Sequence, residues 1–119
     1  ENVLKLIQSD LVLSSHDISN GGLIVALSEM AISSNYGIKI YKPKILRNLF
    51  EYFFGEDQGR YILEIGTKNI SKAEKILKDN NIYFENIGFT QKEYFEIEGI
   101  LKTSIKDLFQ INNEWYNKY

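Results

Sequence analysis

Two adjacent glycines, Gly21 and Gly22, join a strand pattern to a helix pattern, and this junction constrains the fold more than any other feature. Residues 11–14 predict a short buried strand, and residues 21–34 place apolar side chains on one helix face. The glycines therefore fall in the first helical turn. Without a Cβ they let the backbone approach a ligand closely, and the amides of that turn carry the positive end of the helix dipole. The junction thus predicts an anion site, with phosphate as the natural ligand.

The same junction also admits a purely structural interpretation. Ser19 or Asn20 would then cap the helix, and the glycines would only make room for close packing of the helix on a sheet. A glycine pair is not specific by itself. This junction lacks the G-x-G-x-x-G spacing of a dinucleotide fold and the Lys-Ser/Thr pair of a P-loop. From the residues alone, both interpretations stay open.

A second polar motif, Gly55–Arg60, comes directly before a predicted strand. Glu56 and Asp57 can aim two carboxylates at one cation. Gln58 offers an amide, and Arg60 offers a bidentate fork for phosphate. The alternative is a solvent-exposed loop whose arginine pairs with a carboxylate, because surface ion pairs of this kind are common.

His16 is the only histidine of the chain and lies beside Asp17. A His–Asp pair can serve acid–base chemistry near neutral pH. Two neighbours in sequence do not form a relay, however, because catalysis also needs a third group and a positioned substrate. We therefore predict that His16 supports the glycine turn rather than acting in catalysis.

Composition excludes several classes of protein. The 119 residues suffice for one domain with a real core, and no repeat, low-complexity tract or linker marks a second one. The absence of cysteine excludes a disulfide framework, and one histidine leaves no room for a His-rich zinc centre. The net charge of -2 argues against a nucleic-acid surface. No apolar run has the length of a membrane helix, and no signal-peptide pattern opens the chain, so we expect a soluble, cytoplasmic protein.

Helix and strand patterns alternate along the chain, which predicts an α/β or α+β fold: a layered domain with a mixed β-sheet flanked by helices. Asn35–Gly37 supplies a helix stop, and Pro43 opens a new element. In the helix that follows, Phe50 and Phe53 are predicted to pack in the core. In the first half, the predicted helices are residues 2–9, 21–34 and 45–54, and the predicted strands are residues 11–14, 37–41 and 61–65.

The second half predicts two more helices and a hairpin. Ser71 and Glu74 have the spacing of a capping box, and the helix they begin would end at Asn80 and Asn81. Two strand-like runs, residues 83–89 and 94–97, flank a polar segment and predict a β-hairpin. Ser104 is predicted to cap a last helix, whose apolar stripe consists of Ile105, Leu108, Phe109 and Trp115.

Together the two polar motifs resemble those of a known family. HDISNGGLIVALSEMA at residues 16–31, followed by FGEDQGRY at residues 54–61, is similar to the C-terminal domain of the superfamily that includes aminoimidazole ribonucleotide synthetase. Within it, the chain most resembles the large-subunit family of phosphoribosylformylglycinamidine synthase, over essentially its whole length. The family usually has an acid where this chain has Asn20, and because an amide supplies no negative charge, we do not expect a magnesium role at this position.

The resemblance implies a ligase of purine biosynthesis. With ATP, such an enzyme converts formylglycinamide ribonucleotide and glutamine-derived ammonia to formylglycinamidine ribonucleotide. ATP and Mg²⁺ would be bound in the full-length enzyme mainly by upstream domains. A glutaminase subunit and a small bridging subunit would be its partners. Because the chain begins at Glu1 rather than Met, we expect a fragment of such a synthase.

For this domain, residues 1–119, the resemblance implies an anion-binding wall or an auxiliary nucleotide site. It implies no catalytic residue and no metal ligand, and we expect the isolated fragment to be inactive. The alternative is a non-catalytic structural or nucleotide-binding module. Either could expose an apolar face through which the fragment forms a homodimer. The predicted phosphate- or nucleotide-binding residues are His16, Asp17, Ser19, Asn20, Gly21, Gly22, Gly55, Glu56, Asp57, Gln58 and Arg60.

Overall fold

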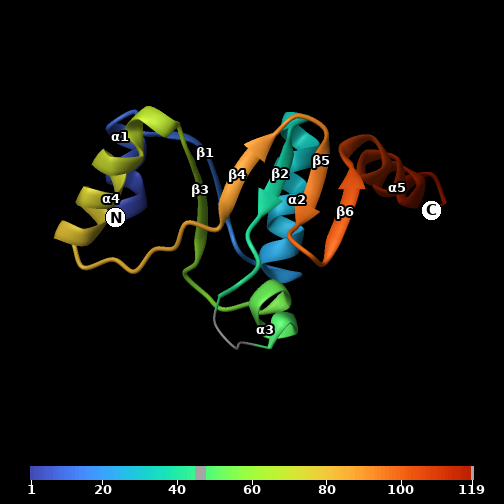
Figure 1. Ribbon diagram of the computed structural model, residues 1–119, viewed down its shortest axis with the longest axis horizontal. Helices are drawn as coiled ribbons and strands as arrows, with labels where there is room; N and C mark the ends of the chain where they lie inside the picture. The colour runs from blue at the N-terminus through green and yellow to red at the C-terminus, as the bar shows by residue number, and fades with distance from the viewer. Residues whose placement is uncertain (45–47, 119) are drawn as a thin grey trace. The chain divides into compact units, whose positions relative to one another are not determined.

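The structure, a computed structural model, describes residues 1–44 and 48–118 (Figure 1). The chain divides into two compact units. The first unit consists of Glu1–Asp17 and Gly59–Asn86, and the second consists of Ile18–Gln58 and Ile87–Tyr119. Each contains both helices and strands, which confirms the predicted α+β class. That the two units form a single domain stays a prediction.

The first unit is built on an antiparallel pair of strands. β1 (Val12–Asp17) pairs with β3 (Tyr61–Ile65), and the register matches Asp17 with Tyr61 at one end of the ladder. The helices α1 (Asn2–Gln8) and α4 (Ile70–Asp79) contact each other, and the short 3₁₀ helix η1 (Thr67–Asn69) leads into α4. A small core joins these elements. It consists of Leu6, Leu11 and Ala73, with Val12, Leu63, Ile65, Ile76 and Leu77 packed against them.

The second unit contains a mixed sheet with strand order β4-β2-β5-β6. β2 lies antiparallel to β4 and parallel to β5, and β6 closes the sheet antiparallel to β5. In Figure 1, α2 runs along one face of this sheet, and it also contacts α3 and α5. The elements are α2 (Gly22–Ser34), β2 (Gly37–Ile40), α3 (Leu49–Phe54), β4 (Gly88–Gln91), β5 (Tyr94–Ile97), β6 (Leu101–Ser104) and α5 (Ile105–Asn117).

The two faces of this sheet differ in chemistry because side chains alternate along each strand. Ile38 pairs with Phe95 and Ile40 with Ile97, and all four are buried. On the opposite face, Lys39 Nζ lies 3.4 Å from Glu96 Oε1. The predicted apolar stripe of α2 is confirmed, since its buried residues are Gly22, Leu23, Ala26, Leu27 and Ala31.

The predicted hairpin of residues 83–89 with 94–97 is wrong. β4 begins only at Gly88, and β2 lies between β4 and β5, so these two strands do not pair. β5 instead pairs with β6, a strand that was not predicted. A hairpin and a connection that crosses the end of a third strand both need a short polar segment. The residue pattern therefore does not distinguish them.

The predicted helix ends have mixed outcomes. Ser104 Oγ accepts a hydrogen bond from Asp107 N at 3.0 Å, which confirms the predicted cap of α5. The capping box at Ser71 is wrong, because α4 begins at Ile70 and Ser71 already lies inside the helix. The predicted end of α4 is confirmed, since Asn80 directly follows the last helical residue, Asp79.

α3 confirms one predicted core residue and contradicts another. Asn48 Oδ1 caps the helix by accepting a hydrogen bond from Phe50 N at 3.0 Å. Phe53 is buried as predicted, but the side chain of Phe50 is 73% exposed. The helix buries the adjacent Tyr52 and Phe53, so the face that carries Phe50 and Phe54 turns to solvent, where their rings stack 5.7 Å apart. The predicted positions Ile45 and Leu46 lie outside the described residues.

Within residues 1–44 and 48–118, each helix is too short or too polar to cross a lipid bilayer.

Gly37 lies where the β4–β5 connection passes the start of β2. A Cβ at this position would overlap the carbonyl oxygen of Tyr94 and lie 2.7 Å from the nitrogen of the same residue. We expect Gly37→Ala to lower the free energy of unfolding by about 3 kcal/mol, because backbone rather than a flexible side chain would have to move. Urea denaturation measures this loss.

Gly66→Ala is the matched control for this experiment. The nearest atom to a Cβ at Gly66 is 3.9 Å away, and its φ of -60° suits any residue. Its unfolding free energy should change by less than about 0.5 kcal/mol. Equal losses in the two variants would contradict the proposed clash at Gly37.

Candidate functional site

The glycine turn, residues 19–22, begins α2 in the second unit. Gly21 occupies the N-cap position with φ +82°, and Gly22 follows with φ +72°. The amide of Gly22 donates to the carbonyl oxygen of Ser19 at 3.1 Å. Because the N-cap position belongs to Gly21, the predicted capping of α2 by Ser19 or Asn20 is wrong. The side chains of both residues are exposed.

Both positions need glycine for steric as well as conformational reasons. A Cβ at Gly22 would lie 2.6–2.7 Å from backbone atoms of Phe53 and Phe54, at the end of α3. A Cβ at Gly21 would overlap Cγ2 of Val25. The structural interpretation of the glycine pair is thus correct in part. The close approach is made by the end of another helix rather than by a sheet.

The loop after α3 supplies an anion to the glycine turn. The amide of Gly21 donates to Oε1 of Glu56 at 2.8 Å, across 35 positions of sequence. A carboxylate is stabilised at a helix amino terminus by the unpaired amides and by the helix dipole. The two sequence motifs therefore meet, and the chain's own carboxylate is the anion at Gly21.

The other residues of the second motif extend this loop. Gly55 ends α3, and its amide donates to the carbonyl oxygen of Glu51 at 3.0 Å. Asp57 and Gln58 are exposed. Across the described ranges, 1–44 and 48–118, no three His, Cys, Asp or Glu side chains form a group that could hold a metal ion.

His16, Asp17 and Arg60 belong to the first unit. β1 continues past its predicted end at residue 14 and includes both His16 and Asp17, which pair with Ile62 and Tyr61. Asp17 and Arg60 thus lie at the same end of the β1–β3 ladder. His16 Nδ1 lies 2.6 Å from the Asp17 carbonyl oxygen and 3.8 Å from its Oδ1. This contact with its own neighbour is consistent with a structural role for His16.

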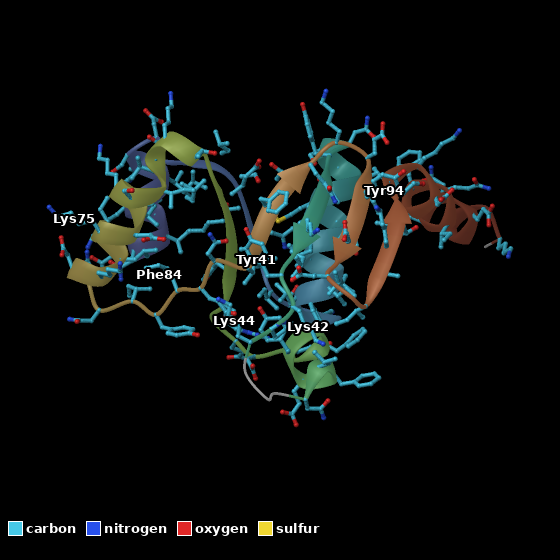
Figure 2. The ribbon with its side chains drawn as sticks, viewed as in Figure 1. Tyr41, Lys42, Lys44, Lys75, Phe84 and Tyr94 are labelled. Carbon is cyan, nitrogen blue, oxygen red and sulfur yellow. The ribbon has the colours of Figure 1, made fainter. Side chains whose placement is uncertain are left out.

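Two cations at the same end of the second unit as the glycine turn were not predicted from the sequence. A short connection reverses the chain between α2 and β2, so the carboxyl end of β2 and the glycine turn lie at the same end of the second unit. Lys42 and Lys44 follow β2 at this end (Figure 2). The amide of Lys42 donates to Oε2 of Glu98 at 3.2 Å. The carboxyl ends of parallel strands, here β2 and β5, are where open sheets bind ligands.

The family model described as AIR synthase related protein, C-terminal domain, matches residues 1–98. The chain is 42% identical over 119 residues to phosphoribosylformylglycinamidine synthase subunit PurL of Pelagibacter ubique, covering 100% of this chain and 16% of the relative. It is 36% identical over 117 residues to the same subunit of Bartonella henselae, covering 98% of this chain and 16% of the relative. The chain therefore spans only 16% of the length of these relatives.

Solved structures of Thermotoga maritima PurL share the fold. The complexes with ADP and FGAR superpose with TM-scores of 0.77 and 0.74 at 17% identity, covering 91% of this chain and 20% of each solved chain. The structure of PurLQS superposes with a TM-score of 0.77 at 16% identity, with the same coverage. At these identities the likeness concerns the fold alone, and it confirms the predicted fold.

The two glycines of the turn should differ in their tolerance of a side chain. Gly22→Ala places a methyl group against backbone, whereas Gly21→Ala meets a valine side chain that can change rotamer. We expect a loss in unfolding free energy of about 3 kcal/mol for Gly22→Ala and of about 1–2 kcal/mol for Gly21→Ala. Chemical denaturation of both variants measures the order, and a larger loss at Gly21 would contradict the contact with α3.

Proposed function

The chain belongs to the family of the AIR synthase related protein, C-terminal domain, and from this membership we propose that it is the C-terminal domain of a phosphoribosylformylglycinamidine synthase large subunit. The observation that carries the proposal is its 42% identity, over all 119 residues, to the PurL subunit of Pelagibacter ubique. The meeting of the two motifs at Gly21 and Glu56 adds support, because it gives their joint presence a physical reason.

The resemblance to phosphoribosylformylglycinamidine synthase implies the reaction of the longer protein. ATP would phosphorylate the amide oxygen of formylglycinamide ribonucleotide. Ammonia derived from glutamine would then attack the activated carbon and displace phosphate, giving the amidine. Thermotoga maritima PurL has been solved in complex with ATP and with FGAR, and these complexes support the assignment. Mg²⁺ would neutralise charge on the transferred phosphoryl group, and we assign its ligands to the rest of the longer protein.

This chain would contribute a wall of the binding cleft rather than catalytic groups. Phosphate oxygens suit the backbone of a glycine turn, and the cations Lys42 and Lys44 lie at the same end of the second unit. We retain as a proposal the predicted phosphate- or nucleotide-binding role of the glycine turn, of Gly55–Gln58 and of Arg60, with support by His16 and Asp17. A nucleotide phosphate that binds the turn would have to displace the Glu56 carboxylate from the Gly21 amide. We expect the isolated chain to lack ligase activity.

A purely structural module is the second candidate function. One observation favours it: the amide of Gly21 already has an acceptor, the Glu56 carboxylate, at 2.8 Å. In this alternative the two motifs would hold α2 and α3 together without a nucleotide. Nucleotide affinity separates the two candidates.

Partners follow from the same proposal. Upstream domains of the synthase, a glutaminase subunit and a small bridging subunit would complete the enzyme. The relatives' designation as a subunit, and the PurLQS structure from Thermotoga maritima, support an assembly of several subunits. We place the enzyme in the cytoplasm, where we expect purine biosynthesis to proceed. Homodimerisation of the fragment stays a prediction.

A chimera tests the proposed function. The matching C-terminal segment of the Pelagibacter ubique subunit is replaced by this chain, and ATP hydrolysis is followed with formylglycinamide ribonucleotide and ammonia. We expect activity within about tenfold of the parent, because 42% of the residues in the exchanged segment are identical. A factor of ten corresponds to about 1.4 kcal/mol in barrier height. The parent without the segment is the control and should be inactive. A folded but inactive chimera, or a fully active truncated parent, would contradict the proposal.

Arg60 tests whether nucleotide binding involves this chain. In the chimera, we expect Arg60→Ala to weaken ADP binding by roughly tenfold, because a guanidinium contributes charge-assisted hydrogen bonds to phosphate. Isothermal titration calorimetry measures the affinity. Lys92→Ala, which removes an exposed cation between β4 and β5, is the control and should bind ADP like the parent chimera. Unchanged binding in Arg60→Ala would favour the structural module.

A further inference from the structure

We propose that Glu56 is a positioning residue whose carboxylate acts as a built-in anion, holding the glycine turn of α2 closed to free phosphate. The inference rests on the proposed function and deepens it, because it names the group that a phosphate must displace to reach the turn. It is carried by contacts among α2, α3 and the loop between Gly55 and Gln58, all within the second unit.

The position of Glu56 is set by packing on both sides of the loop. Tyr52 and Phe53 anchor α3, since both are buried and their rings meet edge to face at 4.9 Å. The backbone of Phe54 lies so close to Gly22 that a Cβ there would be 2.6 Å away. Glu56 follows only two residues later. Its carboxylate is therefore delivered to Gly21 by a short tether, and little further chain entropy is lost when the bond forms.

Two amides at the start of α2, those of Gly21 and Gly22, already donate within the chain. Gly21 N donates to Glu56 Oε1 at 2.8 Å, and Gly22 N donates to the carbonyl oxygen of Ser19 at 3.1 Å. A carboxylate oxygen and a phosphate oxygen accept the same kind of charge-assisted hydrogen bond. A phosphate from solution would therefore have to displace Glu56 to reach Gly21.

Charge near the turn acts in the same direction. Glu56 is an exposed carboxylate bound directly to the Gly21 amide, and a free phosphate would meet this negative group at the amide itself. Removing the Glu56 side chain would free the Gly21 amide and lower this repulsion. The glycine turn should then accept an anion that the wild-type chain rejects.

Nuclear magnetic resonance of the ¹⁵N-labelled 119-residue chain tests both parts of the proposal. In the wild type, we expect the Gly21 amide to exchange slowly with solvent and its resonance to be unmoved by millimolar inorganic phosphate. In Glu56→Ala, exchange of this amide should accelerate by roughly tenfold, because its acceptor is lost, and phosphate should shift its resonance. Glu56→Gln keeps an acceptor without the charge and should give an intermediate response to phosphate.

Glu93→Ala is the matched control, because it removes an exposed carboxylate from another loop of the same unit. It should leave the Gly21 amide and its response to phosphate unchanged. If the Gly21 amide exchanges with solvent at the same rate in Glu56→Ala as in the wild type, the hydrogen bond to Glu56 does not protect the turn, and the proposal is wrong. The Gly21 resonance could also shift equally with phosphate in the wild type and in Glu56→Ala, or shift in neither. Either result would contradict the proposal that Glu56 excludes phosphate from the turn. These readouts are independent of ligase activity, so failure of the chimera would not be confused with failure of this proposal.

Discussion

The close approach of the end of α3 to Gly22 is the contact on which the second unit depends. Since backbone atoms of Phe53 and Phe54 occupy the space of a Cβ, no other residue fits the first position of α2. The contact fixes where α2 begins and which of its faces meets the sheet. It also brings the following loop within reach of the helix terminus. One steric constraint thus sets the packing of α2 and the meeting of the two motifs.

The mixed sheet depends on a second set of close approaches. β2 lies between strands that are joined by only two residues, Lys92 and Glu93, so their connection must pass tightly around its start. Gly37 permits this. Gly88 permits the approach of β4 to β2, because any Cβ at that position would overlap the carbonyl oxygen of Lys39. With β2 between β4 and β5, β2 and β5 run parallel, and the two lysines that follow β2 lie at the carboxyl end of this strand.

Several patterns local to one element were predictive, although the Ser71 capping box was not, and long-range pairing was not predictable from local patterns. The stripe of α2 and the Ser104 cap depend on residues three or four positions apart, so the sequence encodes them directly. The position of β2 between β4 and β5, and the exposure of Phe50, depend on what packs from elsewhere in the chain. The candidate site divides in the same way. Its glycines were predictable from spacing, whereas the partner of Gly21 was not.

Glu56 supplies from within the chain an acceptor for the predicted anion site, and phosphate binding at that site stays a prediction. A helix terminus with two glycines requires an acceptor for its amides, and the residues alone cannot say whether that acceptor comes from solution or from the chain. Here a carboxylate 35 residues away in sequence provides it. A pair of motifs that resembles a ligand site therefore also encodes an internal contact. A nucleotide that binds the glycine turn must therefore compete with the Glu56 carboxylate for the Gly21 amide. The short loop from the packed helix α3 to Glu56 favours the carboxylate in this competition.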